Sequence, residues 1–240
     1  MRICIAQTKA KKGDIAYNIE NHKKWIRIAI SEKADCIFFP ELSLTGYEPD
    51  LAQELAGDQN DSRLTVFQEL SDMNAIVIGV GFPIRSETGI YIGMICIQPH
   101  TPKQTYKKQL LHSDELPFFV PGEKQLILTI KGVRVAPAIC FESLQTSHAI
   151  NVTSLHADIY MASVAKSQSG LEKAYIHYPT IATQYSMPVL MVNAIGRCDT
   201  FDSVGQSAVW DTYGNRKEEL SSDTEGLLIF DTNTLELIKK

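Results

Sequence analysis

The chain has 240 residues, of which 44% are hydrophobic and 21% are charged, and its formal net charge at pH 7 is −5. This length and composition predict a globular protein with a large buried core. The weak negative charge excludes the basic surface with which proteins bind nucleic acids or anionic membranes. No apolar run approaches the roughly 18 residues that cross a bilayer. The chain starts in a strand pattern without a signal peptide, and its five scattered cysteines lack metal-ligand spacing. We therefore expect a cytoplasmic protein without a structural metal or cofactor.

In the first half of the chain, strand and helix patterns alternate and then give way to hairpins. The helix near the N-terminus begins at Asp14 or Asn18. In chain order we predict a strand at 2–8, a helix ending at 31, a strand at 34–39, a helix at 61–73, a strand at 75–80, and a hairpin of 89–97 with 103–106.

In the second half, a hairpin is followed by renewed alternation. Pro179 falls inside the longest predicted helix and should kink or split it. The elements are a hairpin of 126–130 with 133–139, a helix at 144–155, a strand at 158–162, a helix at 171–186, and strands at 188–193, 206–210 and 226–230. With no linker or repeat between them, these elements predict one α/β domain, residues 1–240, with helices on the outer faces of sheets.

The predicted strand at 133–139 ends at Cys140, and the chain turns polar directly after it. This change predicts a sharp strand-to-helix turn, with Ser143 capping the helix. A thiol at such a turn lies beside the backbone N–H of Phe141 and near the positive end of a helix, and both favour the nucleophilic thiolate. The alternative is an inert core cysteine.

Two further strand ends carry reactive groups. Glu41 follows the apolar run Phe38-Phe39-Pro40, where partial desolvation would raise its pKa toward that of a general base. The strand that ends at Lys107-Lys108 alternates, so one lysine should point inward, where its ammonium would stabilise an oxyanion. The alternatives are a solvated loop glutamate and two solvated lysines at a sheet edge. Base, cation and nucleophile together suit thiol-based acyl transfer.

These stretches, in this order, resemble the nitrilase superfamily of carbon–nitrogen hydrolases over nearly the whole chain. The similar motifs are Phe38-Phe39-Pro40-Glu41, Tyr106-Lys107-Lys108, the segment 114–122 with Glu115 before an aromatic-x-Pro-Gly turn, Ala138-Ile139-Cys140-Phe141-Glu142, and the late segments 192–196 and 205–209. One family pattern is absent, because Ile181, Gln184 and Tyr185 stand where relatives commonly have arginine, glutamate and asparagine. The packing of that helix should therefore differ, as should any dimer surface beside it.

The resemblance implies a four-layer α-β-β-α sandwich that commonly assembles into homodimers or larger homo-oligomers. It also implies a thiol-dependent hydrolase of a small amide, ω-amide or N-carbamoyl compound. Glu41 would be the base and Cys140 the nucleophile, Lys108 and the Phe141 N–H would hold the oxyanion, and Glu115 would orient Lys108 or the substrate. The candidate pocket residues are Tyr47, Phe118, Lys166 and Ser167, with Lys166 placed to meet a substrate carboxylate or else solvated in a loop.

Other functions remain open at this stage. A cysteine–histidine hydrolase would need His148 or His177 at the thiol. A relative that has lost turnover would be a scaffold or binding protein, although retention of Glu41, Lys108, Glu115 and Cys140 argues against it. Nitrile hydrolysis, or transfer of the acyl group to an acceptor other than water, would use the same fold.

Overall fold

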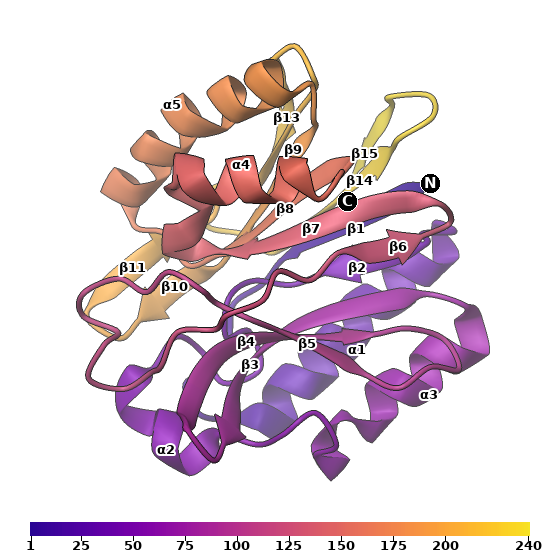
Figure 1. Cartoon of the computed structure of the whole chain (residues 1–240). Helices are drawn as coiled ribbons and strands as arrows, with labels where there is room; N and C mark the ends of the chain where they lie inside the picture. The colour runs from indigo at the N-terminus through magenta and orange to yellow at the C-terminus, as the bar shows by residue number, and fades with distance from the viewer.

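Seven strands form the first sheet of the computed structural model, which describes residues 1–240 (Figure 1). The parallel pairs β1–β2 and β2–β3 lie at its centre, and antiparallel strands flank them. The order across the sheet is β15 (Leu237–Lys239), β14 (Gly226–Asp231), β1 (Arg2–Gln7), β2 (Cys36–Phe38), β3 (Val77–Ser86), β4 (Gly89–Ile97) and β5 (Gln104–Lys107).

The second sheet has six strands and is also mixed. Its central strands β7, β8 and β9 are parallel, and the outer pairs are antiparallel. The order is β13 (Arg216–Glu219), β12 (Ala208–Trp210), β9 (Val189–Asn193), β8 (Ile159–Val164), β7 (Val133–Ile139) and β6 (Leu128–Ile130). A separate two-stranded ribbon of β10 (Ile195–Cys198) and β11 (Phe201–Val204) follows β9.

Helices cover the outer face of each sheet, which produces the expected four layers (Figure 1). On the first sheet lie α1 (Ile15–Ser31) and α3 (Thr65–Asn74), with the short α2 (Ala52–Leu55) nearby; α4 (Thr146–Ser154) and α5 (Gln168–Tyr185) lie on the second. The Asp14 carboxylate accepts a hydrogen bond from the Tyr17 N–H, so Asp14 is the start of α1. No helix has both the length and the apolar character to cross a bilayer.

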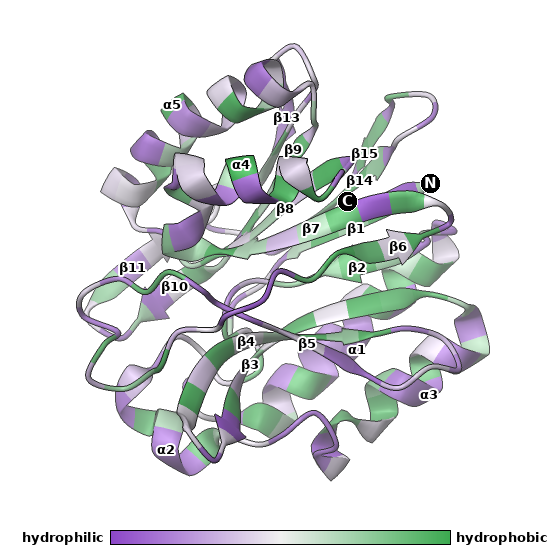
Figure 2. Cartoon of the chain, viewed as in Figure 1, coloured by the Kyte–Doolittle hydropathy of each residue, from purple (hydrophilic) through white to green (hydrophobic).

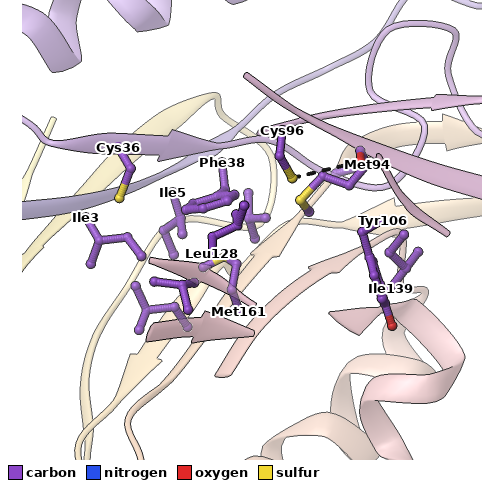
Figure 3. Packing of buried hydrophobic residues seen from close by; sticks show 14 of the residues in the cluster. Ile3, Ile5, Cys36, Phe38, Met94, Cys96, Tyr106, Leu128, Ile139 and Met161 are labelled. Carbon is purple, nitrogen blue, oxygen red and sulfur yellow. Dashed lines mark hydrogen bonds between the residues drawn. The ribbon is translucent and has the colours of Figure 1, made fainter. Parts of the chain in front are cut away.

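The main core lies between the two sheets. Ile3, Ile5 and Phe38 from the first sheet pack toward Leu128 and Met161 from the second (Figure 3). The strands are predominantly hydrophobic, whereas the helices carry mixed colours because only one side of each is buried (Figure 2). Burial of both faces of the central strands explains their nearly continuous apolar sequences.

Several predicted elements differ from the structure. β3 continues to Ser86 rather than ending at Val80, because its residues from Ile78 to Ser86 pair with β4. The ribbon of β10 and β11, and the edge strands β13 and β15, were not predicted, since their sequences are short and partly polar. Pro179 lies inside α5 without splitting it. Ile181 of this helix is buried against the second sheet.

Candidate active site

Cys140 stands at the sharp turn that follows β7. Its φ angle of +46° lies in the left-handed region, which few residues other than glycine adopt. The next residues form a 3₁₀ turn over Cys140–Leu144, so the Phe141 N–H lies in its first turn and has no intrahelical acceptor. The sulfur lies 3.5 Å from the carbonyl oxygen of Ala165, the residue directly after β8.

The predicted cap at Ser143 is wrong. The α-helix begins only at Thr146 after Gln145, and no side chain caps it. The Ser143 hydroxyl instead bonds to the Cys140 carbonyl oxygen at 2.5 Å and to the Tyr178 hydroxyl at 2.7 Å. The 3₁₀ turn separates Cys140 from the α-helix, and Ser143 links this turn to α5.

Lys108 lies between two carboxylates beside Cys140. Its Nζ is 2.8 Å from Glu41 Oε1 and 2.5 Å from Glu115 Oε1, and all three side chains are fully buried or nearly so. Tyr47 donates a hydrogen bond to the same Glu115 oxygen at 2.9 Å. The second oxygen of Glu41, Oε2, has no hydrogen-bond partner. The site therefore holds a buried cation between two acids, and Glu41 has one carboxylate oxygen that accepts no hydrogen bond.

The alternation of β5 explains why Lys108 rather than Lys107 is inside. Tyr106 is buried between the sheets, whereas the Lys107 ammonium lies 3.9 Å above the Tyr91 ring on the other face. Lys108 then turns inward, held by a hydrogen bond from its N–H to the Ile92 carbonyl at 2.9 Å. Strand periodicity thus selects the lysine.

Glu41 is positioned by a loop that packs directly on β3. A Cβ atom on Gly81 would lie 2.4 Å from the Leu42 nitrogen and 2.4 Å from the Pro40 carbonyl oxygen. Only glycine permits this approach, and the Gly81 carbonyl then accepts a hydrogen bond from the Leu44 N–H at 3.0 Å.

The electrostatics of the site confirm one expectation and correct another. Burial raises the pKa of Glu41, as a general base requires, although Lys108 opposes this effect. Burial would lower the pKa of Lys108, but Glu41 and Glu115 outweigh it and raise the pKa above its usual value. The turn was expected to favour the thiolate, but burial, with the charge of Glu41, raises the pKa of Cys140 to about 11. Cys140 therefore rests as a thiol and needs a base.

Glu142 is a buried acid whose role the motif alone did not indicate. Its Oε1 accepts hydrogen bonds from the Ile139 N–H and the Tyr106 hydroxyl, both at 2.7 Å, and its Oε2 accepts one from the Gln109 N–H at 2.6 Å. The carboxylate thereby joins the strand before the nucleophile to the residue after Lys108. Its place directly after Cys140-Phe141 was the only sequence signal for this role.

A pocket of about 790 Å³ opens over Cys140. Of the residues predicted to surround the substrate, Tyr47, Glu115, Phe141, Lys166 and Ser167 line it. Phe118 is not part of the lining and is 39% exposed; its neighbour Phe119 is the buried one. Further lining comes from residues without a sequence signal, among them Phe201 of the unpredicted ribbon and Lys173 and Ile176 of α5.

Neither histidine considered as an alternative base is bonded to Cys140. His148 is buried between two tyrosines, with hydrogen bonds of 3.0 Å to Tyr106 and 2.8 Å to Tyr160. His177 lines the pocket, but its buried Nε2 has no partner. No group of three or more His, Cys, Asp or Glu side chains is arranged to hold a metal ion. Glu41 therefore remains the candidate base for Cys140.

Comparison with protein families gives a match to the carbon–nitrogen hydrolase model over residues 2–239. Among solved structures, an amidase from Nesterenkonia sp. AN1 superposes with a TM-score of 0.88 at 21% identity, over 96% of this chain and 92% of that one. A structure of a glutamate-to-glutamine mutant of the same amidase has acrylamide added to its active-site cysteine. A CN-hydrolase superfamily protein of Xanthomonas campestris, with an arsenic adduct in its active site, also superposes with a TM-score of 0.88, at 18% identity over 98% of this chain and 92% of that one.

Two kinds of curated protein are similar in sequence. The glutamine-dependent NAD(+) synthetase of Thermotoga maritima is 26% identical over 89% of this chain but only 39% of its own length. An (R)-stereoselective amidase of Pseudomonas sp. is 26% identical over 83% of this chain and 73% of that protein. The chain thus spans about two fifths of the synthetase and most of the amidase.

Proposed function

The chain belongs to the carbon–nitrogen hydrolase family, and on this premise we propose that it hydrolyses a small, non-peptide amide through a thioester on Cys140. The observation that carries the proposal is the arrangement of Glu41, Lys108 and Glu115, buried together beside a cysteine that opens into a pocket. The amidase names of similar proteins support this reaction class.

In the first half of the reaction, Glu41 takes the thiol proton of Cys140 on its free oxygen Oε2. The sulfur attacks the amide carbon, and the carbonyl oxygen becomes an oxyanion. The Lys108 ammonium and the Phe141 N–H stabilise this charge; one such donor typically contributes ~3–4 kcal/mol to lowering the barrier. Because Glu41 and Glu115 already hold Lys108 in place, little reorganisation is needed when the oxyanion forms.

In the second half, Glu41 returns the proton to the leaving nitrogen, and the C–N bond breaks to release ammonia or an amine. The acyl group remains on sulfur as a thioester. Glu41 then takes a proton from water, which attacks the thioester carbon through a second oxyanion at the same donors. Collapse of this intermediate releases the acid, and the proton held by Glu41 restores the Cys140 thiol. Glu115 acts by orienting Lys108, to which it is hydrogen bonded at 2.5 Å.

The pocket supports a small polar substrate. Tyr47 and Phe141 contribute aromatic surface, Ser167 a hydroxyl, and Lys166 with Lys173 positive charge. A simple amide, an ω-amide and an N-carbamoyl compound are the substrate classes to compare. Glutamine joins them because of the likeness to glutamine-dependent synthetases.

The test is an ammonia-release assay with a panel of small amides, ω-amides, N-carbamoyl acids, glutamine and nitriles, with Cys140→Ala as the matched control. We expect turnover of at least one amide or carbamoyl compound, and none with the variant. Added hydroxylamine would reveal transfer of the acyl group to an acceptor other than water. Lack of turnover across the panel, together with a Cys140 that does not react with iodoacetamide, would instead favour the scaffold function.

A further inference from the structure

Lys166 is a buried ammonium without an acidic partner. The residue is 3% exposed, and no carboxylate lies within ion-pair distance of its Nζ. The hydrogen bond that Nζ donates runs to the carbonyl oxygen of Cys140, at 3.5 Å. An isolated buried charge costs free energy. We therefore expect an anion beside the nucleophile that the Lys166 ammonium stabilises.

The backbone of Lys166 is fixed by a buried polar network. Its N–H donates to Asn193 Oδ1 at 2.8 Å and to the Ser203 hydroxyl at 3.1 Å, and the Ser203 hydroxyl also donates to the Lys166 carbonyl oxygen at 3.2 Å. These partners come from β9 and β11, while Lys166 itself follows β8. Three strands thus fix the backbone of Lys166, and its ammonium lies beside Cys140.

The formal charges around Cys140 leave one negative charge that the Lys166 ammonium can balance. Lys108 carries one positive charge and contacts two carboxylates, so Glu41, Glu115 and Lys108 together have a net charge of −1 when both acids are ionised. When Cys140 passes its proton to Glu41, the negative charge moves to sulfur, and the group of four still totals −1. The Lys166 ammonium brings this total to zero.

We propose that Lys166 is a positioning residue whose ammonium is the counter-charge of the Cys140 thiolate, complementing a lysine that is already neutralised by its two acids. This inference rests on the proposed role of Cys140 as nucleophile. The two lysines then have different roles: Lys108 stabilises the oxyanion of the substrate, and Lys166 stabilises the sulfur anion.

The charges around the sulfur agree with this assignment. Glu41 and Glu115 raise the pKa of Cys140, in addition to the larger effect of burial, while Lys166 and Lys108 lower it. Burial lowers the pKa of Lys166, and the Cys140 thiolate and Glu41 raise it. The remaining titratable groups around the two residues are Tyr47, Lys173, His177, Tyr178 and Cys198.

The test is the rate at which iodoacetamide alkylates Cys140, followed by mass spectrometry between pH 7 and 9. In Lys166→Met we expect alkylation to be slower by about tenfold or more at each pH, which corresponds to a rise of about one unit in the thiol pKa. Lys166→Arg keeps the charge and should remain within about threefold of the wild type. Lys124→Met is the matched control, since this lysine is exposed and lies outside the pocket, and its rate should not change.

Iodoacetate, which carries a carboxylate, separates this role from recognition of a substrate anion. A counter-charge for sulfur slows both reagents to the same extent in Lys166→Met. An unchanged iodoacetamide rate, or a loss confined to iodoacetate, would overturn the proposal; the second result would make Lys166 a carboxylate-binding residue. Thermal unfolding checks the fold, and Lys166→Gln replaces the methionine variant if that variant does not fold. Alkylation needs no amide turnover, so failure of the amidase proposal would be seen separately.

Discussion

Replacing Glu41 with glutamine tests the base without removing the bulk of the side chain. The Lys108 ammonium keeps its contact with Glu115 at 2.5 Å, so the cation remains in place. The amide that replaces the carboxylate cannot take the thiol proton. Glu41→Gln therefore separates proton transfer from the positioning of Lys108.

The size of the effect follows from the thiol pKa. With a pKa of about 11, only ~10⁻⁴ of Cys140 is ionised at pH 7 without help from a base. A positioned general base contributes typically ~10²–10⁴-fold. We expect kcat/KM for amide hydrolysis to fall by ~10²–10⁴, or about 3–5 kcal/mol in the barrier.

Alkylation of Cys140 should respond differently from hydrolysis. The negative charge of Glu41 raises the pKa of Cys140, so its removal lowers that pKa and favours the thiolate. At pH 9, iodoacetamide should therefore alkylate Glu41→Gln at least as fast as the wild type, while ammonia release from the best amide of the panel collapses. Near-wild-type hydrolysis would refute the base assignment. A parallel loss of both activities would show that Glu41 acts only through the structure of the site.

Four further outcomes are expected. Cys140→Ser and Cys140→Ala should reduce amide turnover to background with an unchanged unfolding temperature, and undiminished turnover in both would exclude Cys140 as the nucleophile. Lys108→Arg keeps the charge, but its planar guanidinium does not fit the fully buried space between two carboxylates, so activity should fall by ~10²-fold or more; near-wild-type rates would contradict this. Gly81→Ala should reduce the free energy of unfolding by about 1–3 kcal/mol, because the added Cβ would lie 2.4 Å from backbone atoms. Gly170→Ala is the control, since its Cβ would make an ordinary contact at 3.4 Å. Equal effects of the two substitutions in chemical denaturation would refute the argument. Light scattering should give at least twice the mass of one chain, because the resemblance implies a homodimer or a larger homo-oligomer; the mass of a single chain would contradict this.

The sequence by itself determined the local positions of the reactive groups. Apolar runs that end abruptly predicted that Glu41 and Cys140 follow buried strands, and alternation before Lys108 predicted one inward lysine. These features depend on side-chain periodicity and burial, which the hydrophobic pattern of each segment indicates by itself. The family resemblance that the ordered motifs support implied the four layers, and the structure confirmed them.

Only the tertiary structure decided how these groups influence one another. The thiol pKa moved opposite to the sequence-based expectation because full burial and Glu41 outweigh the backbone of the turn. Ser143 bonds to Tyr178, a residue 35 positions away, rather than to a helix start. Lys166 lacks an acidic partner because β9 and β11 fix its backbone where no carboxylate reaches. Desolvation and charge pairing depend on what distant segments bring to the same place, and a single stretch of sequence does not contain that information.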